Sequence, residues 1–245
     1  MLLGLVFRGV AFEFVHRTKR MQWFWEAGFC AGSLVAAIAQ GMALGALVQG
    51  ITVDGRAYGG GNWDWLTPFS ALTALALVVG YALLGATWLI LKTESATQAR
   101  AVRFARPLGL AFLALIGVVS ALTPLLRPEY LQRWFGWPSG ALTAIVPLLM
   151  ALAVWQLFTG LRHRDHLRPF LAVVAIFVLA YAGLGVSFYP NIVPPSLTIV
   201  AAAAPDGSLQ FLLVGALFLI PMLLAYTAYS YWVFRGKVRP EDGYH

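Results

Sequence analysis

The chain has 245 residues, of which 60% are hydrophobic and only 11% are charged. A typical soluble domain carries about 25% charged residues. This composition excludes a soluble enzyme, a secreted disulfide scaffold and a disordered chain, and a single cysteine, Cys30, excludes an internal disulfide. The formal net charge of +7 could suggest nucleic acid, but the positions of the charges indicate membrane topology and no nucleic-acid partner.

The first segment, residues 1–14, is apolar apart from Arg8 and Glu13. As a helix it would reach about 21 Å, which is shorter than the hydrocarbon core of about 30 Å. We interpret it as the remnant of a transmembrane helix, and the chain as an N-terminally incomplete copy of a longer protein. A short interfacial helix is the alternative interpretation.

Six long stretches without any charged residue follow. Each is long enough to cross the bilayer as a helix, which needs about 20 apolar residues, and none shows the alternation of a β-barrel strand. We predict an all-α fold, a polytopic transmembrane helical bundle with six full spans plus an N-terminal partial span, in one membrane domain. The predicted spans are 23–51, 66–91, 107–126, 138–161, 169–189 and 208–234, followed by a tail at 235–245.

The connections between these spans differ strongly in charge. Alternate connections, counting the tail, hold 13 lysine and arginine residues against 3 in the others. Basic residues concentrate on the cytoplasmic side of membrane proteins. The pattern predicts that the tail and the basic connections are cytoplasmic. Tryptophans at the predicted span ends, such as Trp23 and Trp65, fit the aromatic belts of a bilayer interface.

Three ionisable residues lie at or near membrane depth: Arg8, Glu13 and Glu26. Such groups are costly in lipid, by about 2.5–3.5 kcal/mol on insertion scales. Arg8 is the deepest, and we expect it to be buried in the bundle beside Glu26 or an acid supplied elsewhere. We expect Glu13 to be buried with it; the alternative for both acids is an ordinary interfacial position.

The span at 23–51 carries small residues at four-residue spacing, with Gly28 before Gly32 and Gly41 before Gly45. This spacing lets helices approach closely in membranes. Gln40 and Gln49 lie on the same span, and buried amides need hydrogen-bond partners. We therefore predict a closely packed internal or subunit-contacting helix with Gln40 and Gln49 as buried polar residues. A polar path along this helix is the alternative.

No arrangement typical of catalysis, nucleotide binding or zinc binding is present. The four histidines fall in connections or the tail rather than at membrane depth, where haem ligands would lie. We therefore assign no catalytic and no cofactor-binding residue, and expect no haem to be bound by this chain alone. The histidines are His16, His163, His166 and His245.

Four segments carry recognisable motifs: residues 5–14 (LVFRGVAFEF), 80–94 (GYALLGATWLILKTE), 189–199 (YPNIVPPSLTI) and 226–238 (YTAYSYWVFRGKV). In this order they resemble subunit II of cytochrome bd-type quinol oxidases. Residues 40–50 and 64–68 are most similar to the cyanide-insensitive branch of that family. The chain departs from the family in lacking its first two helices, in Val15 where arginine is usual, and in residues 200–201 where Trp-Asp is usual.

The resemblance implies a non-catalytic subunit in the bacterial inner membrane. Its partner, subunit I, would hold haems b558, b595 and d, oxidise quinol, reduce dioxygen to water and generate a proton-motive force. Quinol and membrane lipid are the other implied contacts, and a quinone bound to this chain is compatible with the family. The resemblance also implies a metal-ligand role for Glu26. A transporter or channel, and an inactive fragment of the oxidase subunit, are the alternative functions.

Overall fold

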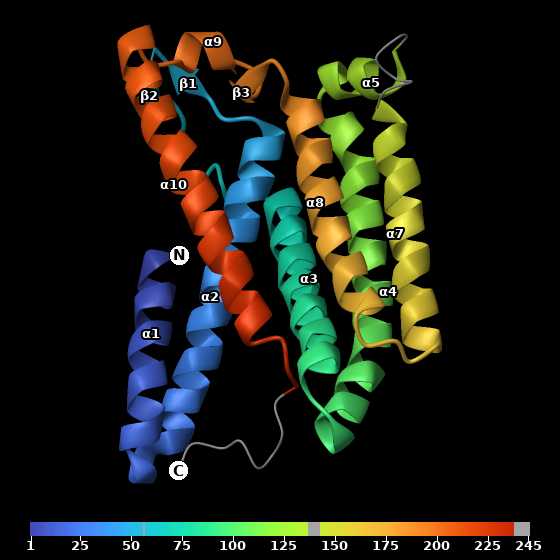
Figure 1. Ribbon diagram of the computed structural model, residues 1–245. Coiled ribbons are helices and arrows are strands. Elements are labelled where there is room, and N and C mark those ends of the chain that lie inside the picture. Colours follow the sequence, from blue (N-terminus) through green and yellow to red (C-terminus); the bar gives the residue numbers. More distant parts are fainter. Residues whose placement is uncertain (56, 137–142, 238–245) are drawn as a thin grey trace.

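The computed structural model describes residues 1–55, 57–136 and 143–237 and forms an up-and-down bundle of helices (Figure 1). Within these ranges, six helices are long and apolar enough to cross a membrane, which confirms the predicted fold class. Their bounds are α2 (Gln22–Gln49), α3 (Pro68–Lys92), α4 (Ser95–Leu126), α7 (Ile145–Arg162), α8 (Arg168–Phe188) and α10 (Asp206–Val233).

The partial span is helix α1 (Leu2–Arg17), which a single turn of 3-10 helix, η1 (Lys19–Met21), joins to α2. Its 16 residues reach about 24 Å. The two helices pack closely through glycine, because a Cβ atom added to Gly32 would lie 2.6 Å from the carbonyl oxygen of Gly4. Further along, the rings of Phe14 and Trp25 stack with their centroids 4.9 Å apart. Backbone approach and aromatic stacking thus fix α1 on α2.

Helices α2 and α3 also meet through glycine. A Cβ atom on Gly45 would lie 2.5 Å from the Cα atom of Ser70, and one on Gly41 would lie 2.9 Å from the backbone nitrogen of Ala74. At this approach the hydroxyl of Thr73 donates a hydrogen bond to the Gly41 carbonyl oxygen over 2.9 Å. The close packing predicted from small residues on this span is therefore present, and its partner is α3.

Helix α3 begins at a complete capping box. The Oγ1 atom of Thr67 accepts the N–H of Ser70 over 3.0 Å, and the Oγ atom of Ser70 accepts the N–H of Thr67 over 2.9 Å. Pro68 occupies the first turn, where its missing N–H costs nothing. These residues satisfy donors that a helix start would otherwise leave unpaired.

Helix α4 is longer than the span predicted at 107–126, because it begins at Ser95. Its 32 residues reach about 48 Å, well beyond the hydrocarbon core. Pro107 therefore lies inside the helix instead of at its start, and the basic residues Arg100, Arg103 and Arg106 stand on a helical extension.

The span predicted at 138–161 corresponds to α7, which begins at Ile145; residues 137–142 lie outside the described ranges.

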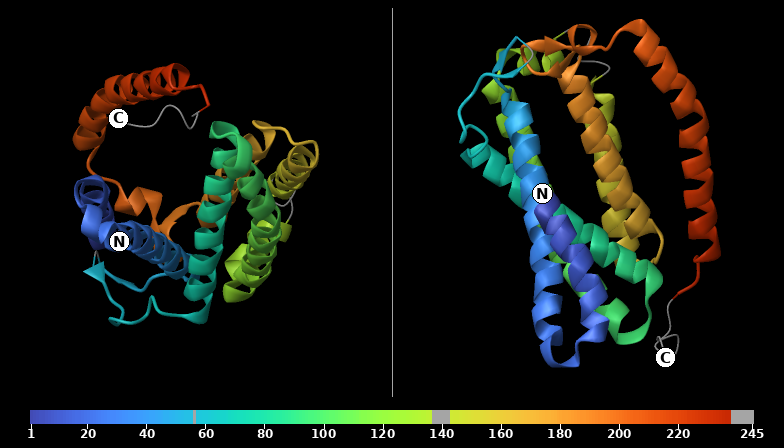
Figure 2. Two further views of the ribbon diagram at one scale, coloured as in Figure 1. Left: turned by 90° about the horizontal axis from the view of Figure 1, so that it is seen from below. Right: turned by 90° about the vertical axis from the view of Figure 1, so that its left-hand side faces the viewer.

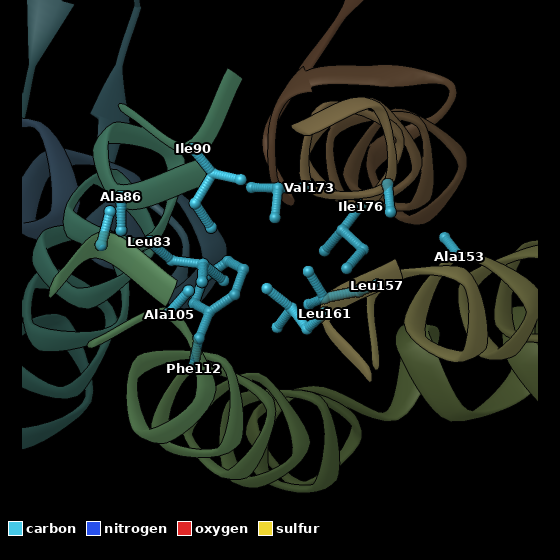
Figure 3. Packing of buried hydrophobic residues seen from close by; sticks show 12 residues of the cluster. Leu83, Ala86, Ile90, Ala105, Phe112, Ala153, Leu157, Leu161, Val173 and Ile176 are labelled. Carbon is cyan, nitrogen blue, oxygen red and sulfur yellow. The ribbon is translucent and has the colours of Figure 1, made fainter. Parts of the chain in front are cut away.

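The main core lies between α3, α4, α7 and α8 (Figure 3). Leu83, Leu157, Val173 and Ile176 are completely shielded from solvent, and Phe112 of α4 reaches into the same cluster. These apolar side chains stabilise the fold through dense packing and through the removal of their surface from solvent. This four-helix unit holds the larger of the two buried apolar clusters found among the described residues.

Apart from η1, the short elements lie together at one end of the bundle (Figure 1). Elements of two to eight residues show no clear hydrophobic period, so the sequence did not predict them. They are the antiparallel pairs β1 (Val53–Asp54) with β2 (Ala57–Tyr58) and β3 (Asn191–Val193) with β4 (Leu197–Thr198), helix α5 (Pro128–Phe135) and the single turn α9 (Ile199–Ala202).

Helix α10 stands apart from the other helices (Figure 2), and none of its residues is buried. Its attachments gather at its C-terminal end. The Nζ atom of Lys92 donates to the carbonyl oxygens of Phe234 and Gly236, the rings of Trp88 and Tyr231 meet edge to face at 6.0 Å, and Lys237 lies 3.9 Å from Glu94.

Candidate functional site

Arg8 lies on α1, with its guanidinium over the ring of Phe29 at 5.1 Å from the centroid. The side chain is exposed, and within the described residues it forms no ion pair with Glu13 or Glu26. This differs from the expected burial beside an acid. The physical reason is the position of α1, which packs on α2 and leaves its other faces open. A cation over an aromatic face takes the place of the expected carboxylate.

The two acids are exposed as well. Glu26 lies in the second turn of α2 and accepts a hydrogen bond from the Nε2 atom of Gln22 over 3.0 Å. Glu13 is on the exposed surface of α1. The described part of the chain contains no group of three or more histidine, cysteine, aspartate or glutamate residues able to hold a metal. Because metal sites need at least three or four ligands, the surroundings of Glu26 do not by themselves form one.

Gln40 is half-buried on α2 and accepts a hydrogen bond from the hydroxyl of Tyr81 over 3.0 Å. The Tyr81 ring stacks on Phe177 with centroids 5.8 Å apart, and Phe177 stacks in turn on Phe112 at 5.5 Å. One amide is thereby connected to an aromatic stack that crosses from α3 to α8 and α4. The predicted polar partner for Gln40 is present, and it comes from α3.

Gln49 ends α2 within a set of polar contacts that we call the Gln49 cluster: Gln49, Thr67, Ser70, Arg127 and Tyr130. Its side-chain oxygen accepts the Thr67 hydroxyl over 2.6 Å, and its backbone carbonyl oxygen accepts the Nε–H of Arg127 over 2.8 Å. The Ser70 hydroxyl reaches the Trp65 carbonyl oxygen at 2.6 Å. The cluster therefore joins the end of α2 to the start of α3 and to the α4–α5 connection.

Tyr130 completes this cluster from α5. Its hydroxyl donates to the carbonyl oxygen of Val48 over 2.9 Å, and only 2% of the residue is exposed. Burial raises the pKa of the Tyr130 phenol, Glu129 raises it further, and Arg127 and Arg133 act in the opposite direction. The phenol is thus held neutral as a hydrogen-bond donor at neutral pH.

A second polar contact fastens α5 to α8. Ser187 is buried, its hydroxyl accepts the indole N–H of Trp134 over 2.9 Å, and its carbonyl oxygen accepts an N–H of Arg133 over 3.0 Å. Sequence reasoning missed these residues and those of α5. The available signals were Pro128 in the first turn and Glu129 beside it, which are typical of a helix start.

These contacts are structural hydrogen bonds, without a nucleophile paired to a base among the described residues. The described histidine side chains, His163 and His166, are exposed on the α7–α8 connection, and the Nδ1 atom of His166 lies 2.8 Å from the amide nitrogen of Gln98. Neither can reach a group at membrane depth. Within the described residues, the spans therefore offer no histidine pair for axial ligation of a haem.

Fold and hydropathy together define a multi-pass helical membrane protein, with six candidate spans among the described residues. Residues 1–234 match the family described as cytochrome bd terminal oxidase subunit II. The chain belongs to this family, as its sequence motifs predicted.

Individual relatives cover almost the whole chain. It is 28% identical to cytochrome bd-I ubiquinol oxidase subunit 2 of Escherichia coli (strain K12), across 98% of this chain and 73% of that protein. It is 25% identical to cytochrome bd ubiquinol oxidase subunit 2 of Bacillus subtilis (strain 168), across 98% and 72%. The solved structure of bd oxidase from Geobacillus thermodenitrificans shares the fold, with a TM-score of 0.70 at 21% identity, covering 94% of this chain and 72% of that one.

Proposed function

We propose that this chain is the non-catalytic subunit II of a bd-type quinol:oxygen oxidoreductase in a bacterial inner membrane. The family match over residues 1–234 carries the proposal. In this assembly a partner, subunit I, holds haems b558, b595 and d, oxidises quinol and reduces dioxygen to water. The placement of His163 and His166 outside the spans agrees with haem ligation by the partner.

The contribution of this chain to the complex is then structural. The Gln49 cluster and the Ser187 contacts hold α2, α3, α5 and α8 in register at one end of the bundle. The glycine contacts hold α1, α2 and α3 together along their lengths. A rigid scaffold of this kind keeps a neighbouring haem subunit in one arrangement without touching the reacting atoms.

Charge supports one orientation. The connections η1, α3–α4 and α7–α8 and the end of α10 share one end of the bundle (Figure 1). Together with the helix ends beside them, including the start of α4, they carry most of the lysine and arginine residues. By the positive-inside rule this end, with the C-terminus, faces the cytoplasm. The short strands, α5 and α9 then face outward.

Co-purification tests the assignment. The chain is tagged and expressed together with a haem-bearing subunit I of a bd-type oxidase, and the pair is isolated in mild detergent. We expect stoichiometric recovery of both chains and a reduced-minus-oxidised spectrum with b-type and d-type haem bands. Recovery of the tagged chain alone, free of haem, would point to a transporter or channel instead and would overturn the proposal.

A further inference from the structure

An apolar groove of about 680 Å³ lies between α7 and α8 and is open to the surface of the bundle. Leu149, Leu152, Leu171 and Val178 line it as partly exposed side chains, and the smaller Ala153 and Ala172 form its floor. The volume is within the range of sites that hold small ligands, about 300–1,000 Å³. Its open side is where a membrane-spanning chain meets lipid or a neighbouring protein.

Two polar residues distinguish this groove. Arg168 stands at its basic end, and Gln156 projects from α7 further along it. Gln156 is half-buried, and within the described residues its amide makes no hydrogen bond to the protein. An amide at membrane depth is costly without a partner, so the groove presents an unsatisfied donor and acceptor to whatever occupies it.

The spacing of these two residues along the bundle can be read from packing. A Cβ atom on Gly160 would lie 3.1 Å from the Cβ atom of Arg168, so Gly160 and Arg168 are level. Gln156 precedes Gly160 by four residues, about 6 Å deeper into the bundle. Leu149 lies about 16 Å deeper than Gly160. The groove thus offers, in order of depth, a guanidinium, an amide and an apolar channel.

Charge at the rim favours an anion. The connection at 162–168 carries three arginines, Arg162, Arg164 and Arg168, against Asp165 alone. The Asp165 carboxylate engages the Nε atom of Arg168 at 3.0 Å, and a guanidinium has five N–H donors, so its terminal nitrogens retain donors for a second anion. The other oxygen of Asp165 accepts the backbone N–H of Leu167 over 3.2 Å just before α8, so the two remaining arginines carry the net positive charge of this connection.

We propose that this groove binds an anionic phospholipid. The phosphate would lie on Arg168, a glycerol ester carbonyl would accept from the Gln156 amide one helical turn deeper, and an acyl chain would follow the leucines toward Leu149.

A second groove, between α3 and α4, gives the contrast. It is lined by Pro68, Phe69, Leu72, Leu122, Leu125 and Leu126 alone, and offers no group for a phosphate. The proposal depends on membrane placement and not on the oxidase function.

Native mass spectrometry of the delipidated protein, with any subunit that co-purifies, tests the site. The probes are phosphatidylglycerol with ester-linked chains, its diether analogue without carbonyls, and phosphatidylcholine of the same chain length. We expect phosphatidylglycerol to bind about tenfold more tightly than phosphatidylcholine, as for a charge-assisted contact. Arg168→Gln should abolish this preference, Arg168→Lys should retain most of it, and Arg103→Gln, an exposed arginine of α4, should leave it unchanged.

Gln156 has its own readout. Gln156→Leu should weaken the ester lipid severalfold and leave the diether lipid unaffected, which a merely structural role would not do. The melting temperature of each variant confirms folding. Equal binding of the two head groups by the unaltered protein, or equal loss in Arg168→Gln and Arg103→Gln, would overturn the proposal. Displacement of phosphatidylglycerol by an uncharged quinone, unchanged in Arg168→Gln, would also overturn it and assign the groove to a quinone.

Discussion

Arg127 donates its Nε–H to the backbone carbonyl oxygen of Gln49 over 2.8 Å, although 78 residues separate the two in sequence. The guanidinium also covers Gly50, whose φ of +91° is accessible mainly to glycine. Arg127 is both the C-cap residue of α4 and the N-cap residue of α5. A single side chain therefore ties together the ends of α2, α4 and α5.

Replacement of Arg127 by alanine should destabilise the protein by about 1–3 kcal/mol, because the Gln49 carbonyl oxygen loses its partner in a half-buried site. Thermal unfolding in detergent, followed by circular dichroism, measures this loss. The control is Arg100→Ala on the exposed extension of α4, where we expect no measurable change. Similar melting temperatures for the two variants would contradict a structural role for Arg127.

The glycine contact between α2 and α3 gives a second prediction. Gly45→Ala should cost about 1–3 kcal/mol, because the added methyl group would overlap Ser70 and the two backbones would have to separate. In Gly85→Ala the new Cβ meets nothing within 4 Å, so this helical glycine should gain up to about 1 kcal/mol from higher helix propensity. Opposite shifts of the melting temperature are expected, and a shift in the same direction would refute the packing argument.

Tyr130 should make stability depend on pH in the alkaline range. Because burial raises the pKa of its phenol above the ordinary value of 10.0, the unfolded state ionises first as the pH rises. The contribution of the neutral Tyr130 phenol to the free energy of unfolding is fully present below about pH 10, and it is lost as the pH rises above that value.

Tyr130→Phe is the matching variant, since it removes the hydroxyl and keeps the ring. At pH 7 it should be less stable by about 1 kcal/mol through loss of the bond to the Val48 carbonyl oxygen. Above pH 10 the difference between the two proteins should shrink, as measured by chemical denaturation over pH 7–11. A difference that stays constant with pH would show that the phenol does not titrate in this way.

Arg8→Ala and Arg17→Ala test the proposed assembly. Arg8 lies over Phe29 at membrane depth, whereas Arg17 ends α1 at the basic end of the bundle. We expect haem per purified complex to fall in Arg8→Ala, because the contact between α1 and α2 is weakened, and to remain near normal in Arg17→Ala. Equal losses in the two variants would show that depth does not matter.

The spans could be predicted because charged groups are excluded from lipid, and the gaps between charges therefore reveal the helices. The same reasoning could not find the start of α4. There the helix continues beyond the membrane, so Arg100 and Arg103 are on a helix that faces water. Charge marks the edge of the bilayer, and a helix can extend past it.

The polar contacts were only partly predictable. Gln40 and Gln49 were identified because amides in a span need partners, but their partners, Tyr81 and Thr67, come from another helix that only the fold brings near. The acid expected for Arg8 is replaced by Phe29, because an aromatic ring satisfies a cation without a charge. Sequence therefore indicated which groups need partners, and the packing of α1, α2 and α3 decided which partners they have.

Helix α10 buries no residue against its own chain and is fastened near Lys92, Trp88 and Glu94. Exchange of one aliphatic side chain for another along its middle would thus leave the folding of this polypeptide almost unaffected. Whatever restricts variation along that helix must act from outside the chain, through the surrounding lipid or a neighbouring protein. In this helix, substitutions that change contacts with lipid or another protein should leave the folding stability of the chain itself unchanged.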